Sequence, residues 1–288
     1  MDKLRIGGVA EHFNTPWHLG IEGGNFHSEG IDLQWKTYHG GTGAMTEAMN
    51  SGELDVCIAL TEGMISSILK GNPSRIISTY VVSPLIWGVH TGAGSSLQYY
   101  TDIFKKKYAI SRLGSGSHLM PIVDASHRGL RLSQDQFVKV GNLDGALDSL
   151  SKNESQVFYW EKYTTNPYVK KGLLRSLGDY VAPWPSFVIA ATEDTLRHNE
   201  RALSRMLKTI YFLNRHLMHA KNAIELVGQY YKNDPSQLEQ WFYSTEWATH
   251  DELSEKLLDN VIHSLIKAGI HKGGKDYKLS DLCYRVGH

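Results

Sequence analysis

The chain has 288 residues, and its 30 basic and 30 acidic side chains give a formal net charge of zero. A neutral chain sets up no overall field toward nucleic acid or an anionic membrane surface, so we do not expect nucleic-acid binding. The longest apolar runs are too short and too interrupted to span a bilayer, so we expect no membrane insertion. The apolar fraction of 41% and the aromatic fraction of 10% indicate a folded protein with a real core. A chain of this length can form one domain or two.

The two cysteines, Cys57 and Cys283, lie near opposite ends of the chain. They have none of the paired spacings of a zinc knuckle or a disulfide framework, so we predict no redox chemistry and no cofactor. Met1 leads directly into an apolar run without the charged start and cleavage site of a signal peptide. The sequence as written therefore predicts a cytoplasmic protein, or a periplasmic one if a signal peptide has been removed.

Strand-like and helix-like segments alternate through the first third of the chain. The predicted strands are 4–9, 31–35, 56–60, 75–82 and 86–89, and helices are predicted to begin after Pro16, at Thr42 and at Met64. This βαβα order is typical of a parallel sheet covered by helices on both faces.

A small-residue stretch at 91–96 has the composition of a linker, and a second α/β series follows it. Its predicted strands are 108–111, 137–140, 156–160 and 187–191, with helices from the turn at 115–118 to about 128 and over 144–150. Beyond Glu193 the apolar residues recur with helical spacing. We therefore expect two α/β halves followed by C-terminal helices.

The most informative segment is the glycine-rich turn at 38–43, which leads into the helix predicted from Thr42. Glycine lets a ligand approach the backbone closely, and the first N–H groups of a helix are free to bind it. In open α/β sheets ligands sit at the carboxyl ends of strands, so this turn predicts a binding crevice. The turn lacks the Lys and Ser/Thr of a phosphate-binding P-loop, and nucleotide hydrolysis is not supported.

Four segments together resemble the type 2 periplasmic-binding-protein fold, in the branch that binds aliphatic sulfonates, nitrate and thiamine-pyrimidine precursors. The segments are Glu22-Gly23-Gly24-Asn25-Phe26 with Gly30-Ile31-Asp32-Leu33, then Ser51-Gly52-Glu53-Leu54-Asp55-Val56, Gly145-Ala146-Leu147, and Phe158-Tyr159-Trp160-Glu161. Lys162 stands where the family often has proline. The chain is also similar to cytosolic fungal and bacterial members of this family, whereas the cysteine-rich signature of pyrimidine-precursor synthases is absent.

The resemblance implies an α/β protein of two lobes, each a mostly parallel sheet flanked by helices. Residues 1–90 and 187–288 would form the first lobe and 91–186 the second, with two chain crossings acting as a hinge. A hinge allows a ligand bound between the lobes to stabilise their closed arrangement. Relatives of this kind deliver solutes to ABC transporters, so the resemblance leaves a transporter partner open.

The candidate ligand-binding residues follow predicted strands or begin predicted helices on the cleft side. They are Glu11, His12, Phe13, Trp17, His39, Gly41, Thr42, Thr61, Glu62, Ser115, Gly116, Ser117, His118, Trp160, Glu161 and Trp184. Each also has a structural interpretation: surface turn, ordinary helix cap or, for the tryptophans, packing at the hinge. We predict no metal site, and the one arrangement left open is a convergence of His12, His39 and His118 across the cleft. The pair His216 and His219 has no third ligand at zinc-like spacing.

Helix N-termini favour a negative group, whereas Glu11, Glu62 and Glu161 favour amino or protonated ring groups. We therefore expect non-catalytic binding of a small organic solute, either a flat polar ring similar to a thiamine-pyrimidine precursor or a small organic anion. The alternative is an enzyme on the same fold. It would use Glu62 or Glu161 as a general base, or Lys36 or Lys70 to hold a cofactor aldehyde. Ser117 is a poor nucleophile candidate because no G-x-S-x-G pattern surrounds it.

Overall fold

The computed structural model describes residues 1–230, 235–251, 253–272 and 278–287. Its strands are β1 (Asp2–Gly8), β2 (Ile31–Thr37), β3 (Val56–Leu60), β4 (Ser74–Gly92), β5 (Tyr108–Ile110), β6 (Phe137–Lys139), β7 (Val157–Glu161) and β8 (Leu174–Thr192). Its α-helices are α1 (Thr15–Glu22), α2 (Asn25–Ser28), α3 (Thr42–Asn50), α4 (Thr61–Leu69), α5 (Gly116–His127), α6 (Leu143–Ser151), α7 (Lys162–Lys170), α8 (Glu193–His198), α9 (Glu200–His219), α10 (Ala223–Tyr230), α11 (Pro235–Tyr243) and α12 (Glu255–Lys267). Short 3-10 helices are η1 (His12–Asn14), η2 (Tyr100–Lys105), η3 (Gln134–Gln136) and η4 (Leu279–Asp281).

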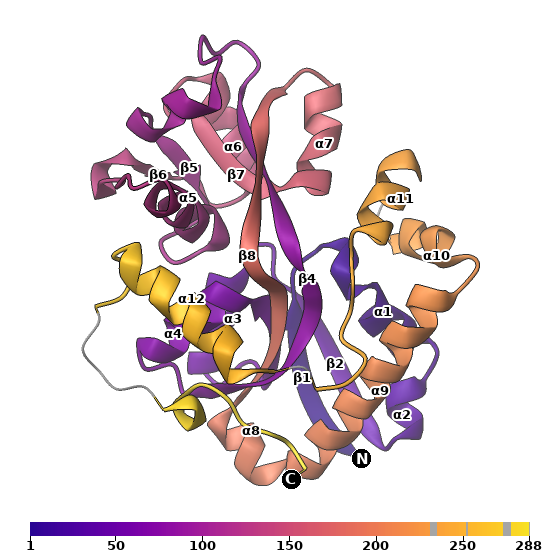
Figure 1. Cartoon of the computed structure of the whole chain (residues 1–288). Coiled ribbons are helices and arrows are strands. Elements are labelled where there is room, and N and C mark those ends of the chain that lie inside the picture. The colour runs from indigo at the N-terminus through magenta and orange to yellow at the C-terminus, as the bar shows by residue number, and fades with distance from the viewer. Residues whose placement is uncertain (231–234, 252, 273–277, 288) are drawn as a thin grey trace.

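The strands form one sheet in the order β2-β1-β3-β8-β4-β7-β5-β6. Strands β1, β2 and β3 pair in parallel at one end of the sheet, and β5, β6 and β7 pair in parallel at the other. Figure 1 shows these two groups as separate lobes, each with its own helices, joined by the long strands β4 and β8. The α/β class and the two-lobed arrangement predicted from the sequence are confirmed.

The lobes differ from the sequence expectation in how they are joined. The sequence predicted two separate strands at 75–82 and 86–89 and a short return strand at 187–191, but β4 and β8 are each 19 residues long and pair antiparallel along most of their length. Proline donates no ladder hydrogen bond, and the register shifts on both sides of the Pro84–Pro185 pair. Pairing resumes beyond these bulges, so the sheets of the two lobes are continuous through a two-stranded ribbon, β4–β8.

Aromatic side chains fill the core of the first lobe. Trp17 is fully buried and stacks on Phe26 with ring centroids 5.6 Å apart. The C-terminal segment returns to this lobe, since Trp247 bridges to Val81 of β4 and donates its indole N–H to the carbonyl of Phe13. The same hydrophobic cluster continues past the ribbon into the second lobe, where it includes Tyr108 and Val157. A smaller apolar cluster lies among β5, β7, β8 and α6.

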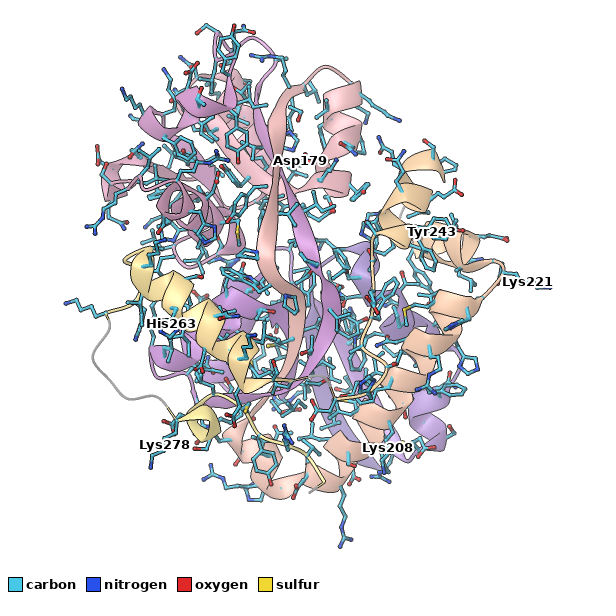
Figure 2. All side chains as sticks on the ribbon, viewed as in Figure 1. Asp179, Lys208, Lys221, Tyr243, His263 and Lys278 are labelled. Atoms are coloured by element: carbon cyan, nitrogen blue, oxygen red, sulfur yellow. The ribbon has the colours of Figure 1, made fainter. Side chains whose placement is uncertain are left out.

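Charged side chains are spread over the surface. Lys208, Lys221 and Lys278 are exposed and lie far apart around the first lobe in Figure 2. Among the described residues, no helix has the length and apolar character needed to cross a membrane.

Candidate functional site

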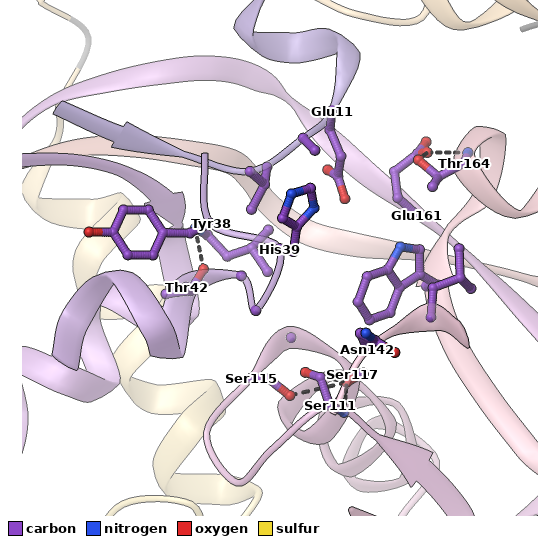
Figure 3. A pocket seen from close by; sticks show the side chains of 18 of the residues that line it. Glu11, Tyr38, His39, Thr42, Ser111, Ser115, Ser117, Asn142, Glu161 and Thr164 are labelled. Carbon is purple, nitrogen blue, oxygen red and sulfur yellow. Dashed lines mark hydrogen bonds between the residues drawn. The ribbon is translucent and has the colours of Figure 1, made fainter. Parts of the chain in front are cut away.

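A cavity of about 390 Å³ lies between the lobes, beside the β4–β8 ribbon. Its wall combines the loops after β1 and β2, the N-terminus of α3, the ends of β3 and β7, and the N-termini of α5, α6 and α7. Nine of the residues predicted from the sequence border it: Glu11, His39, Gly41, Thr42, Ser115, Gly116, Ser117, Trp160 and Glu161. Figure 3 shows several of these side chains converging from both lobes.

Helix α3 presents an open N-terminus to the cavity. Gly41 adopts φ +70°, a conformation that favours glycine, and no side chain caps the helix. The Thr42 hydroxyl accepts a hydrogen bond from the backbone N–H of Leu60 at 3.0 Å, which fixes the helix start against the end of β3. The N–H groups of Ala44 and Met45 donate to the Gly41 carbonyl, and those of Thr42 and Gly43, which have no acceptor among the described residues, remain available to a ligand.

Helix α5 presents a second open N-terminus from the other lobe. Ser115, Ser117 and Ser111 are buried around it, and the Ser117 hydroxyl accepts from the Ser111 N–H at 3.0 Å. A Cβ added to Gly116 would lie 2.5 Å from both Leu60 Cδ1 and Trp87 Cη2. Only glycine allows α5 to approach the first lobe this closely, so the lobes are in contact at the edge of the cavity.

Helices α6 and α7 also begin at the cavity, but side chains of the protein cap both. Asn142 accepts from the Gly145 N–H at 2.9 Å, and Glu161 accepts from the N–H of Tyr163 at 3.1 Å and of Thr164 at 2.6 Å. The hydroxyl of Thr164 donates to the same carboxylate at 2.7 Å. These bonds fix the orientation of the Glu161 carboxylate at the cavity wall.

Glu11 and Glu161 line the cavity from opposite lobes, and the Glu161 carboxylate is turned toward Thr164 (Figure 3). Burial and, second, the charge of Glu161 raise the pKa of Glu11 to about 8. Burial also raises the pKa of Glu161, while its bonds to Thr164 and Tyr163 oppose that effect. A like-charged neighbour in a low-dielectric site disfavours ionisation, which places the pKa of Glu11 above neutrality.

Aromatic rings supply the apolar part of the wall. Trp160 is partly exposed into the cavity and stacks on Phe158 with centroids 5.2 Å apart and planes 24° apart. Trp87, Tyr168 and Phe187 add further ring surface. A wall of this composition suits a flat ligand, because aromatic rings favour offset stacking.

Several lining residues escaped the sequence-based selection: Tyr38, Trp87, Ser111, Asn142, Asp144, Thr164, Tyr168 and Phe187. Asn142 could have been found, since an Asn directly before a predicted helix is a typical N-cap. Tyr168 lies on α7, whose internal Pro167 and weak apolar pattern gave no helix signal.

Three predicted residues of the first lobe lie in its core instead of the cavity wall. His12 is 3% exposed, its ring lies 4.8 Å from that of Trp241, and burial lowers its pKa to about 4. Phe13 packs on Phe187, which itself lines the cavity, and Trp17 is fully buried. The segment after β1 turns into the core directly after Glu11, so only the first residue of this group reaches the cavity.

Three other predicted residues tie the start of α4 to the ribbon. The Thr61 hydroxyl donates to the carbonyl of Pro185 at 2.6 Å, and the indole N–H of Trp184 donates to Glu62 Oε2 at 2.9 Å. Glu62 and Trp184 are 1% and 3% exposed and do not border the cavity. Burial raises the pKa of Glu62 to about 7, against the smaller effects of its own backbone N–H and of the Trp184 bond.

The histidines do not converge on a metal. His118 lies behind the α5 N-terminus, where its Nδ1 accepts from the Gly114 N–H at 3.0 Å, and it borders a different hollow from His39. Within the described ranges, no group of three His, Cys, Asp or Glu side chains could hold a metal ion. His216 and His219 each place Nδ1 against a carbonyl of their own helix.

The fold and the cavity between its lobes define the class of protein: this is a two-lobed protein of the generic periplasmic-binding-protein fold. Residues 87–180 match the model of a family described as Ca3427-like periplasmic binding proteins. A search of curated proteins found no match to the chain.

Solved structures support the same class. The Candida albicans CA3427 gene product, described as defining a new family with the generic periplasmic-binding-protein fold, is 25% identical, with 96% of this chain and 92% of that chain covered and a TM-score of 0.89. The alkanesulfonate-binding protein SsuA from Xanthomonas axonopodis pv. citri, bound to MOPS, is 14% identical, with 93% of each chain covered and a TM-score of 0.78. The periplasmic nitrate-binding protein NrtA from Synechocystis PCC 6803 is 14% identical, with 82% and 69% covered and a TM-score of 0.64.

Proposed function

We propose that this protein binds a small organic solute, without catalysis, in the cavity between its lobes. The observation that carries the proposal is the composition of the wall, because residues from both lobes and from the ribbon surround one space of about 390 Å³. Such a volume, with apolar walls and a few directed polar groups, is typical of small-molecule sites. The ligand we propose is a flat polar ring similar to a thiamine-pyrimidine precursor, or a small organic anion.

The ribbon supports a hinge as part of this proposal. The register shifts around Pro84 and Pro185 give β4–β8 a weak point between the lobes, where bending breaks few ladder bonds. We also propose that the chain passes between the two lobes near residues 90 and 187, on the two strands of this ribbon. A ligand that contacts both walls stabilises the closed arrangement by its difference in affinity for the two states.

The enzyme alternative has less support from the geometry. The Ser117 hydroxyl is hydrogen-bonded to the Ser111 N–H and lies 3.0 Å from the Ser115 hydroxyl, with no histidine in this cluster. Lys36 is exposed and pairs with Glu53, and Lys70 borders the hollow behind α5 instead of the interlobe cavity. A Schiff-base lysine must reach the bound substrate, and neither lysine lies at this cavity. Of the two candidate general bases, Glu62 does not border the cavity, whereas Glu161 does and its carboxylate accepts hydrogen bonds from Tyr163 and Thr164.

The test is native mass spectrometry of the purified protein for a co-purifying small molecule, followed by thermal unfolding with that molecule added. A ligand of the folded state raises the melting temperature by linkage, and Trp160→Ala is expected to abolish the shift. Val181→Ala, a truncation of an exposed apolar residue, is the matched control. If no co-purified or added small molecule raises the melting temperature, or if Trp160→Ala leaves the shift unchanged, the proposal fails.

A further inference from the structure

The ionisable groups of the interlobe cavity are mainly acidic. The wall contains three carboxyl groups, those of Glu11, Asp144 and Glu161, together with the imidazole of His39. Among the residues that the structure describes, no lysine or arginine borders the cavity. The side chain of Arg112 packs against Gly40 and Gly43 of the glycine-rich turn and is not part of the wall.

Two of these carboxyl groups line the cavity from opposite lobes, close enough for the charge of Glu161 to raise the pKa of Glu11. Glu161 is 3% exposed and is held by three hydrogen bonds from Tyr163 and Thr164. Within the described part of the chain, the carboxyl of Glu11 makes no hydrogen bond and no ion pair. Burying a carboxyl group without a partner is unfavourable unless a ligand or a proton compensates it.

We propose that Glu11 and Glu161 together bind one positively charged nitrogen group of the ligand, a protonated amine or an amidinium, which bridges the two lobes. This inference rests on the proposed function and narrows its ligand class to organic cations and zwitterions. A planar amidinium has several donors and can serve both carboxylates at once, as charge-assisted bonds between such groups are short and strong. The open N-termini of α3 and α5 remain for an acceptor at the other end of the ligand.

The bridge also accounts for lobe closure. Without a cation, closing the lobes brings two carboxyl groups together at a buried position, and one of them must take up a proton. A cation replaces that proton and makes contacts to both lobes that exist only in the closed arrangement. Binding therefore releases a proton from Glu11, in surroundings that also contain Tyr38, His39, Asp144, Tyr168 and Glu161 in the wall and Lys162 beside Glu161.

Benzamidine is a suitable probe because it is flat and stays protonated from pH 6 to 8. Benzamide, its neutral analogue, and benzenesulfonate, an anion of similar size, complete the set. By isothermal titration calorimetry at pH 8, we expect benzamidine to bind about tenfold or more tightly than the other two, the ratio that one charge-assisted hydrogen bond supplies. The benzamidine affinity should fall as the pH is lowered toward 6, by up to about tenfold per unit below the pKa of Glu11.

Glu11→Gln is the decisive variant, since this side chain has no structural hydrogen bond to lose. It should weaken benzamidine binding at pH 8 to the level of benzamide and remove the pH dependence, while benzamide binding is unchanged. Asp148→Asn removes an exposed carboxylate of α6 outside the cavity and is expected to bind as the unmodified protein does. Glu161→Gln should act as Glu11→Gln does, with circular dichroism to check that α7 keeps its cap.

The outcomes separate the two proposals. Benzamidine binding that needs Glu11 supports the bridge. If benzenesulfonate or benzamide binds in a Trp160-dependent way while benzamidine does not, or if Glu11→Gln leaves benzamidine binding intact, the bridge is refuted and solute binding stands. If none of the three probes binds and the protein carries no co-purifying molecule, solute binding and the bridge are both refuted.

Discussion

The hydrogen bond between Trp184 and Glu62 gives a direct test of how α4 is fixed to the ribbon. Trp184→Phe removes the indole N–H and leaves Glu62 Oε2 without its donor, while Oε1 has no side-chain or backbone partner already. Both side chains are almost fully buried, so water cannot replace the bond. Leaving a buried polar group unsatisfied costs about 1–3 kcal/mol, which for a chain of this size corresponds to a fall in melting temperature of about 2–6 °C.

The pH dependence of this loss identifies its cause. The pKa of Glu62 is about 7, so the folded protein carries the carboxylate at pH 8.5 and the neutral acid at pH 5.5. The indole N–H stabilises the carboxylate more than the acid, and the destabilisation by Trp184→Phe should therefore be larger at pH 8.5. Thermal unfolding followed by circular dichroism measures both values, and a double-mutant cycle with Glu62→Gln isolates the pair. Equal losses at both pH values together with no coupling in the cycle would refute the reasoning.

Three further predictions concern single positions around the cavity. Asn142→Ala removes the N-cap of α6 and should lower the free energy of unfolding by about 1 kcal/mol in urea, whereas Asn142→Asp, which keeps an acceptor, should cost less; equal losses would contradict a capping role. Gly116→Val places side-chain atoms where Leu60 and Trp87 now pack, so the lobes should be held apart, and a larger radius of gyration in small-angle scattering checks this against Gly94→Val, at a glycine with open space around it. Glu11 has a folded-state pKa near 8, above the value of about 4.5 in the unfolded chain. Between pH 5 and pH 8 the unfolded chain therefore carries the carboxylate while the folded protein keeps the proton, so the free energy of unfolding falls as the pH rises. The gain in melting temperature from Glu11→Gln should grow over that range, and a constant gain would count against the buried carboxyl pair.

Much of the fold could be predicted from the sequence because its strands are short apolar runs closed by polar or glycine residues. The strand over 56–60 was predicted to the residue, and the helix starts at Thr42 and near Ser115 were also correct. The ribbon was not predictable in the same way. Pro84 and Pro185 indicate strand ends locally, and only the pairing of two distant segments keeps both strands extended through them.

The candidate site residues were also predictable only in part. Residues that directly follow a strand or open a helix, such as Glu11, Ser115 and Glu161, were placed at the cavity by topology alone. Neighbours a few positions along, such as Trp17 and Glu62, were misplaced because local sequence does not tell whether a polar or aromatic side chain turns toward the crevice or the core. Glu62 has its partner 122 positions away, in a segment whose path depends on the whole ribbon.

The position of β8 has a consequence for synthesis of the chain. It lies between β3 and β4 in the sheet, with Ala191 opposite both Val56 and Arg75. During translation β1, β3 and β4 therefore emerge well before β8, the strand that lies between β3 and β4. By the time β8 emerges, the strands β5, β6 and β7 of the second lobe are already complete. We expect the second lobe to reach its native contacts first on the ribosome. The first lobe exposes the unpaired edges of β3 and β4 until residue 192 has been added. During this interval chaperone binding would protect the first lobe from aggregation.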